Sequence, residues 1–136
     1  MYLLDTDIIS NLMRRTPSTV LIARLAVIPP EQQFSSAITL SELLYGAYRR
    51  GVQATGLLER LETLILPNLP ILPFDVEAAY QYGKIRAVME QIGTPIGDAD
   101  LRIAAIALAH GLTVVTGNVS HFRRVPELAM ENWLEM

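Results

Sequence analysis

Carboxylate side chains recur where the predicted strands of this chain give way to helices. Asp5 ends an apolar run at the start of the chain, and Glu42 lies in the first turn of a helix expected after the second strand. Asp100 lies near the start of a strongly apolar helix, and Asn118 follows a short β-branched run. In open parallel sheets, ligands bind at the carboxyl ends of the strands. Asp5, Glu42 and Asn118 sit at such ends and can therefore converge on one cleft.

Converging carboxylates need protons or cations to offset their charge. At about 4 Å and an effective dielectric constant near 20, each like-charge pair costs on the order of 4 kcal/mol. The chain has no cysteine, and His110 and His121 are interpreted as a helix-end and a loop residue rather than as metal ligands. Oxygen ligands without thiolates or paired histidines favour Mg²⁺ or Mn²⁺. Such ions suit the hydrolysis of phosphate esters.

Each of these acids also has a purely structural interpretation. Glu42 is spaced from Thr39 as in a capping box. Asp98 and Asp100 would complement a helix dipole, and Asp98 is placed to pair with Arg102 one turn later. A buried carboxylate at the end of the first strand is harder to explain in this way, because burial is costly without a partner.

The hydrophobic pattern predicts strands and helices that alternate along the chain. Strands are expected at 1–4, 33–38, 71–72, 113–116 and 133–134. Helices are expected at 5–15, 17–27, 39–51, 55–66, 75–92 and 98–110, with Thr6 or Asp7 as the cap of the first. The helix at 98–110 is apolar nearly all round, which predicts deep burial. This order indicates an α/β domain with a mostly parallel central sheet flanked by helices.

Length and composition restrict the class of protein further. A chain of 136 residues with 51% apolar residues has room for one domain, expected to span residues 1–136. Its net charge of −3 argues against a protein that coats nucleic acid through overall basicity. No apolar run approaches the roughly 18 residues that cross a bilayer, and no signal peptide is apparent. A soluble cytoplasmic protein without a membrane partner is expected.

Six short segments, in this order, resemble the motifs of PIN-domain ribonucleases, and most closely those of VapC-type toxins. They are Leu4–Ser10, Leu40–Leu43, Asp100–Ala105, Val115–Asn118, His121–Pro126 and Glu131–Trp133. The resemblance spans nearly the whole chain. It implies a PIN-like fold and metal-dependent cleavage of RNA, usually a structured RNA of the translation machinery. It also implies neutralisation by a small antitoxin protein and a homodimeric state.

Carried over residue by residue, the resemblance implies that Asp5, Glu42 and Asp100 hold one or two Mg²⁺ or Mn²⁺ ions. Asn118 stands where the family has a fourth acid, and Asp98 is an additional acid that would compensate for its missing charge. Thr6 and Thr116 are expected to hydrogen-bond the carboxylates that hold the ion. The implied reaction is in-line attack by water on a phosphodiester, without a covalent intermediate.

Adjacent arginines provide the expected contacts to RNA phosphates. Arginine pairs occur at 14–15, 49–50 and 123–124, and each pair would rim the cleft. Helical spacing puts Arg49 on the side of Glu42. The expected RNA-binding residues are Arg14, Arg15, Arg49, Arg123 and Arg124.

Two other functions fit the same residues. The opening Asp5-Thr6-Asp7 also fits a haloacid-dehalogenase-type phosphatase, in which Asp5 would be the nucleophile and Gly97-Asp98 a later motif. That motif should end a hydrophobic strand, whereas a helix, Gly93 and Pro95 precede it here. Alternatively, the chain keeps a PIN-like fold and acts only as a binding module, since Asn118 weakens the set of acids.

Overall fold

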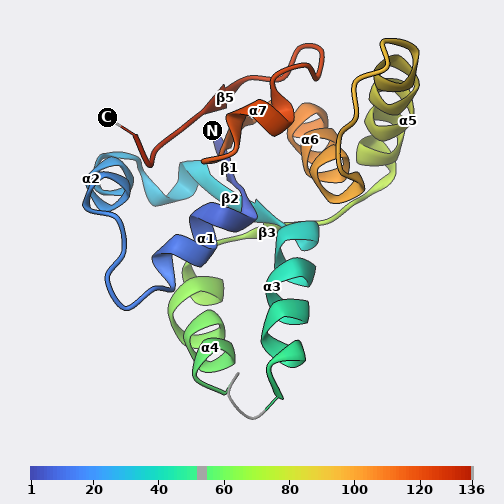
Figure 1. The fold of residues 1–136 in the computed structure, drawn as a ribbon. Coiled ribbons are helices and arrows are strands. Elements are labelled where there is room, and N and C mark those ends of the chain that lie inside the picture. Colours follow the sequence, from blue (N-terminus) through green and yellow to red (C-terminus); the bar gives the residue numbers. More distant parts are fainter. Residues whose placement is uncertain (52–54, 136) are drawn as a thin grey trace.

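A parallel sheet forms the centre of the computed structural model, which describes residues 1–51 and 55–135 (Figure 1). The five strands are β1 (Tyr2–Leu4), β2 (Gln33–Ser36), β3 (Ile71–Leu72), β4 (Thr113–Val115) and β5 (Met130–Glu131). Their order in the sheet is β3-β2-β1-β4-β5, and every pair is parallel. Leu3 lies opposite both Phe34 and Val114. The β1 strand is therefore central, with its carboxyl end between those of β2 and β4.

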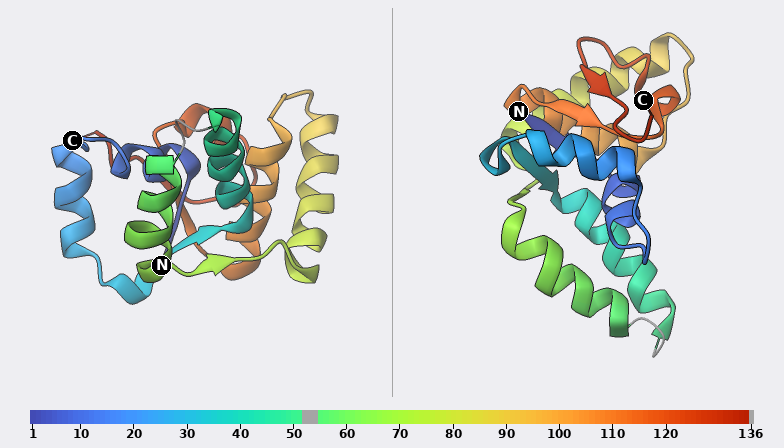
Figure 2. Two further views of the ribbon diagram at one scale, coloured as in Figure 1. Left: turned by 90° about the horizontal axis from the view of Figure 1, so that it is seen from below. Right: turned by 90° about the vertical axis from the view of Figure 1, so that its left-hand side faces the viewer.

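Helices cover both faces of the sheet (Figure 2). They are α1 (Thr6–Leu12), α2 (Thr19–Val27), α3 (Ala37–Arg49), α4 (Thr55–Arg60), α5 (Val76–Gln91), α6 (Asp98–His110) and α7 (Val119–Phe122). The α4 helix continues as a π-helical segment, Leu61–Ile65, and a 3-10 turn, Leu66–Asn68. Another 3-10 turn, Pro30–Gln32, precedes β2. Within residues 1–51 and 55–135, no helix has both the length and the apolar character needed to cross a bilayer.

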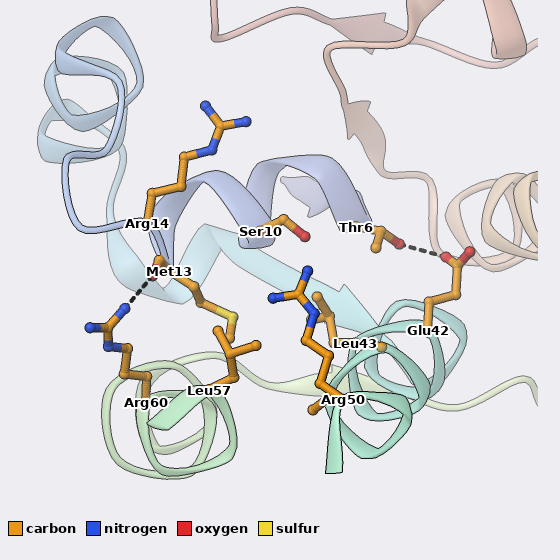
Figure 3. A pocket seen from close by; sticks show the side chains of 11 residues that line it. Thr6, Ser10, Met13, Arg14, Glu42, Leu43, Arg50, Leu57 and Arg60 are labelled. Carbon is orange, nitrogen blue, oxygen red and sulfur yellow. Dashed lines mark hydrogen bonds between the residues drawn. The ribbon is translucent and has the colours of Figure 1, made fainter. Parts of the chain in front are cut away.

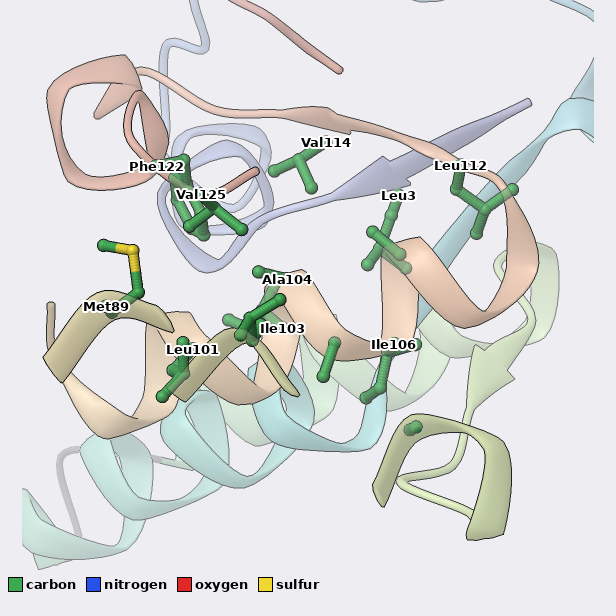
Figure 4. Close-up of a cluster of buried hydrophobic side chains, with 14 residues drawn as sticks. Leu3, Met89, Leu101, Ile103, Ala104, Ile106, Leu112, Val114, Phe122 and Val125 are labelled. Atoms are coloured by element: carbon green, nitrogen blue, oxygen red, sulfur yellow. The ribbon is translucent and has the colours of Figure 1, made fainter. Parts of the chain in front are cut away.

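Successive side chains of the central strands enter two different hydrophobic cores, because side chains alternate between the faces of a sheet. Leu3 and Val114 belong to one core, which α5, α6 and α7 complete with Ile85, Met89, Ile103, Ile106 and Phe122 (Figure 4). Leu4 and Val115 belong to the other core, which α1, α2 and the C-terminal segment complete with Ile8, Ile9, Leu21 and Trp133. The fold is an α/β/α sandwich, as predicted, and α6 is deeply buried.

The helix starts differ from the predicted ones. Ser36, rather than Thr39, caps α3, because its Oγ accepts a hydrogen bond from the Thr39 N–H at 3.0 Å. The predicted capping box of Thr39 and Glu42 is therefore wrong, and Glu42 lies in the second turn of the helix. Asp5 itself caps α1 by accepting from the Thr6 N–H at 2.8 Å. Short polar residues at strand ends thus take the capping positions.

The last strand also lies elsewhere than predicted. Strand β5 covers Met130–Glu131, and the predicted strand at 133–134 is wrong. The backbone N–H of Thr116 donates to the Glu131 carbonyl, which fixes the pairing with β4. Trp133 is 1% exposed; its ring lies 4.9 Å from that of Tyr2, and its indole N–H donates to Glu131. The apolar character of this segment therefore comes from a buried anchor that follows the strand.

Candidate active site

Three neighbouring strand ends bring the predicted acids to one edge of the sheet. Asp5 directly follows β1, the central strand, while α3 with Glu42 follows β2 on one side of it. Thr116 and α7 follow β4 on the other side. Asp100 lies in the first turn of α6, which packs beneath this edge. The topology is the one that places a site at the carboxyl end of a parallel sheet.

Asp5 is the buried centre of this arrangement, with only 3% of its surface exposed. Its Oδ1 accepts from the Thr6 N–H at 2.8 Å, and its Oδ2 accepts from the Thr116 hydroxyl at 2.9 Å. Both donors are neutral. Burial raises the pKa of Asp5 from 3.8 to about 6, and the charges of Asp7 and Asp100 add to the rise while the two hydrogen bonds oppose it. Asp5 is thus a carboxylate whose negative charge is poorly compensated.

Glu42 is joined to Asp5 through a single residue, Thr6. The Thr6 hydroxyl donates to Glu42 Oε1 at 2.6 Å, while the Thr6 backbone N–H holds Asp5 (Figure 3). The Glu42 side chain is exposed and faces a pocket, as its position off the apolar stripe of α3 predicted. The expected role of Thr6 in orienting carboxylates is consistent with this geometry.

Asp100 lies on the α7 side of the site and has a partner that the sequence did not single out. Its Oδ2 is 3.1 Å from His121 Nδ1, and a quarter of its side chain is exposed. Its charge is close enough to Asp5 to contribute to the raised pKa of that carboxyl. A histidine six residues beyond the end of β4, on the short helix that follows the turn, is the signal that could have indicated this contact.

Asp98, in contrast, is directed to other partners. It accepts from the Tyr82 hydroxyl at 2.5 Å and from Arg102 Nε at 2.7 Å, the latter being the pairing expected from their spacing. These hydrogen bonds, that of Tyr82 first, lower the pKa of Asp98. The Arg102 guanidinium also lies 4.8 Å from the centre of the Tyr82 ring. Asp98 therefore joins α5 to α6 through these hydrogen bonds.

Asp7 supports the turn that carries Thr116 and Asn118, a role that the sequence did not suggest. Its Oδ2 accepts from the Gly117 N–H at 2.8 Å, and its Oδ1 lies 3.5 Å from the Thr116 hydroxyl. The same Thr116 oxygen accepts from the Asn118 N–H at 2.9 Å. Burial raises the pKa of Asp7, although the Gly117 hydrogen bond opposes the rise. Asn118 is exposed, and its side chain makes no capping bond to α7.

The donor chemistry of Asp5, Glu42 and Asp100 fits a hard divalent cation. All three offer carboxylate oxygens, and the central one is buried beside further negative charge. Across residues 1–51 and 55–135, however, no three Asp, Glu or His side chains lie close enough together to enclose one ion. The three carboxylates thus lie along one edge of the sheet without enclosing one common point.

A pocket of about 420 Å³ extends from Glu42 and Thr6 between α1, α3 and α4 (Figure 3). Its charged rim consists of Arg14, Arg50 and Arg60, and we call it the arginine pocket. Its apolar wall consists of Met13, Leu43, Ala47 and Leu57. Arg60 is held in place, because its Nη1 donates to the Met13 carbonyl at 2.9 Å.

The predicted RNA-binding arginines are only partly placed on this rim. Arg14 lines the arginine pocket, and Arg15 lines a smaller neighbouring hollow of about 190 Å³. Arg49 does not line the pocket; its guanidinium lies 5.6 Å from the centre of the Tyr45 ring, and Arg50 lies in the pocket instead. Arg124 donates to the Thr94 hydroxyl at 3.4 Å, while Arg123 is exposed beyond α7.

Comparison with known proteins identifies the family. The profile of the PIN domain matches residues 2–128. The "tRNA(fMet)-specific endonuclease VapC" of Salmonella typhimurium is 39% identical over 104 residues, 72% of this chain and 73% of that protein. "Toxin FitB" of Neisseria gonorrhoeae is 38% identical over 137 residues, 98% of this chain and 99% of that protein. The crystal structure of FitAcB from the same organism superposes with a TM-score of 0.89 at 38% identity, covering 100% of both chains.

The fold and the edge of acids thus belong to a protein of the PIN-domain family. Within it, this chain is a VapC-type ribonuclease, as its motifs predicted. The haloacid-dehalogenase-type phosphatase is excluded. Its Gly-Asp motif would have to end a strand, whereas Gly97 and Asp98 begin α6.

Proposed function

We propose that this protein is a metal-dependent endoribonuclease that hydrolyses phosphodiester bonds of a structured cellular RNA, as the toxin of a toxin–antitoxin pair. The environment of Asp5 carries this proposal. A carboxylate buried to 3% exposure, hydrogen-bonded to the neutral donors Thr6 and Thr116 and close to Asp100, gains stability from a cation. The metal dependence and the nature of the RNA go beyond the family assignment.

Asp5, Glu42 and Asp100 are the side chains that would hold Mg²⁺ or Mn²⁺, and Asn118 would add a carbonyl oxygen. When bound, such an ion acts as a Lewis acid toward the phosphoryl oxygens and makes a coordinated water a stronger nucleophile. Thr116 and Thr6 keep Asp5 oriented through the two hydrogen bonds described above. In-line attack by water leaves no covalent bond between the RNA and the protein.

The arginine pocket is the proposed approach of the RNA strand on the α3 side. Arg14 and Arg50 line a hollow that reaches Glu42, so a phosphate held there lies next to the acids. Basic side chains at this place allow a chain with a net charge of −3 to bind RNA locally. Arg50 replaces Arg49 in this role.

The proposed substrate is a structured RNA of the translation machinery. The Salmonella relative, which is named for its specificity toward tRNA(fMet), supports a transfer RNA as the first substrate to examine. The neutralising partner would be a small antitoxin protein, as the resemblance implies and as the name of the Neisseria toxin supports. Exposed apolar side chains such as Tyr45, Tyr48, Val76 and Tyr80 support a homodimer.

Incubation of the purified protein with total RNA, followed by mapping of the cut ends, tests the proposal. We expect discrete cuts in the presence of Mn²⁺ or Mg²⁺, and none after chelation or in the Asp5→Asn variant. The Asp75→Asn variant is the matched control, because Asp75 caps α5 and lies outside the site. A wild-type protein that leaves all RNA intact at every metal concentration contradicts the proposal. If it binds RNA nonetheless, it is a binding module with a PIN fold.

A further inference from the structure

A second hollow lies on the α7 side of the acids. Its volume is about 490 Å³, and its walls are formed by Pro95, Ile96, Gly97, Asp100, Ser120 and His121. These residues come from the segment before α6, the first turn of α6 and the short helix α7, which lie together in Figure 1. We call it the histidine hollow. No role in RNA binding was predicted from the sequence for Pro95, Ile96 or Ser120.

The order of the strands puts the two hollows on opposite sides of Asp5. The arginine pocket includes Glu42 of α3, which follows β2, and the histidine hollow includes Ser120 and His121 of α7, which follows β4. Strand β1, which ends at Asp5, lies between β2 and β4. If the scissile phosphate of an extended RNA strand lies at the acids, one hollow therefore lies next to the nucleotides before that phosphate and the other next to those after it.

The lining of the histidine hollow suits a nucleotide. Pro95 and Ile96 offer apolar surface to the face of a base, and Ser120 and His121 offer a hydroxyl and an imidazole for hydrogen bonds. The imidazole is fixed by its contact with Asp100 at 3.1 Å. This contact links the hollow directly to the acids.

Two arginines, Arg123 and Arg124, follow α7 in the chain without lining the hollow. Arg124 Nη1 donates to the Thr94 hydroxyl at 3.4 Å, and so ties the end of α7 to the segment that leads into Pro95. Arg123 precedes it and is exposed. Two guanidinium groups, a kind that contacts RNA phosphates, thus follow in the chain the helix that carries Ser120 and His121.

We propose that the histidine hollow binds the RNA nucleotide that flanks the scissile phosphodiester on the side opposite the arginine pocket, with its base against Ile96 and its polar edge at Ser120 and His121. This inference rests on the proposed ribonuclease function and assigns part of its sequence preference to these side chains.

Three RNA oligonucleotides designed around a cut mapped in total RNA test this assignment. One extends on both sides of the cut, one lacks the 5′ flank, and one lacks the 3′ flank. Ser120→Trp fills the hollow from an exposed position on α7. We expect the Ser120→Trp variant to raise KM about tenfold for the full oligonucleotide and for the truncated form that keeps the nucleotide bound in the hollow. A tenfold change is the size of effect expected from the loss of one stacked base. For the form that lacks the nucleotide bound in the hollow, KM and kcat should equal those of the wild type.

Glu90→Trp is the matched control. Glu90 lines a separate hollow of about 230 Å³, whose lining also includes Pro95 and Ile96 but not Ser120 or His121, so this variant should keep the wild-type KM for all three RNAs. Ile96→Ala, which removes the apolar wall without adding bulk, should show the same dependence on RNA length as Ser120→Trp. Circular dichroism establishes that each variant is folded.

The assignment is overturned if Ser120→Trp and Ile96→Ala leave every KM unchanged, or raise it equally for all three RNAs. Both outcomes presuppose a wild type that cleaves the full oligonucleotide, so they contradict the nucleotide subsite and not the ribonuclease. A wild type that cleaves none of the RNAs contradicts the proposed function, and the subsite with it.

Discussion

The Asp7 carboxylate accepts a hydrogen bond from the backbone N–H of Gly117 at 2.8 Å, although 110 positions separate the two residues. A Cβ atom on Gly117 would lie 2.7 Å from Asp7 Oδ2 and 2.8 Å from the Leu134 side chain. The turn after β4 thus lies so close to α1 and the C-terminal segment that a side chain on residue 117 would force the Asp7 carboxylate and the Leu134 side chain to shift. This turn carries Thr116, which orients Asp5, so the contact links packing to the acids.

Gly117→Ala should therefore destabilise the protein by ~1–3 kcal/mol, the usual cost of overpacking. It should also slow RNA cleavage, because the displaced turn moves Thr116 away from Asp5. Gly83→Ala is the control: nothing lies within 4 Å of its added Cβ in the middle of α5, and it should stabilise by ~0.5–1 kcal/mol. Urea unfolding measures both changes. Equal stability of the two variants would contradict the close fit at Gly117.

Asp5→Asn should abolish cleavage and, without metal, leave stability at neutral pH unchanged or improved. The pKa of Asp5 is 3.8 when unfolded and about 6 when folded, so the folded state binds the proton more tightly. This proton contributes stability fully below about pH 3.8, and the contribution is lost as the pH rises through about 6. The loss amounts to roughly 3 kcal/mol at most.

The difference in unfolding free energy between Asp5→Asn and the wild type should accordingly grow in favour of the variant from pH 4 to pH 7. Chemical unfolding in the presence of a chelator measures it. A variant that is clearly less stable at pH 7 would mean that Asp5 serves mainly as a hydrogen-bond partner of Thr6 and Thr116.

Asp98→Asn and Asp100→Asn should separate two acids that lie two residues apart. Asp100 contacts His121 and affects Asp5, so its neutralisation should lower kcat by about a hundredfold or more. Asp98 is bonded to Tyr82 and Arg102, and its neutralisation should change kcat by less than about twofold. Steady-state cleavage of one RNA substrate gives both values. Comparable losses in the two variants would return Asp98 to the site.

Asn118→Asp should tighten Mn²⁺ binding severalfold, because it restores a negative charge at the position where the family has an acid. The backbone of residue 118 is already fixed by its hydrogen bond to Thr116, so the substitution changes charge without moving the turn. Titration calorimetry measures the affinity. Weaker binding in the variant would remove residue 118 from the metal site.

Arg50→Ala should weaken RNA binding and lower the slope of log K against log salt by about one, the contribution of one phosphate contact. Its neighbour provides the control, because Arg49 lies over the Tyr45 ring outside the arginine pocket. Fluorescence anisotropy at several salt concentrations, with the Asp5→Asn background preventing cleavage, gives both slopes. Arg49→Ala should leave the slope unchanged, and the opposite result would reverse the two roles.

The alternation of strands and helices was predictable from hydrophobic periodicity, because burial on one or both faces leaves a local pattern. The left-handed Gly111 after α6 and the Asp75 cap of α5 were also predictable, because the end of a helix depends mainly on the few residues around it. The strand at Trp133 was mispredicted, since an anchoring apolar side chain and a strand residue give the same local signal. The capping box at Thr39 failed because Ser36, one turn earlier, competes for the same helix end.

The sequence by itself determined the fold class and the family, and it pointed to Asp5, Glu42 and Asp100 as candidate acids of the site. It did not determine the partners of these acids, because hydrogen bonds such as Thr6 to Glu42 and Thr116 to Asp5 join segments that are distant in the chain. The tertiary structure decided that Asp98 pairs with Tyr82, that Asp7 supports the turn at Gly117 and that Arg50, not Arg49, enters the pocket. Helical spacing fixes the direction of a Cβ atom, whereas the position of a charged side-chain end depends on the rings and carboxylates that the fold brings within its reach.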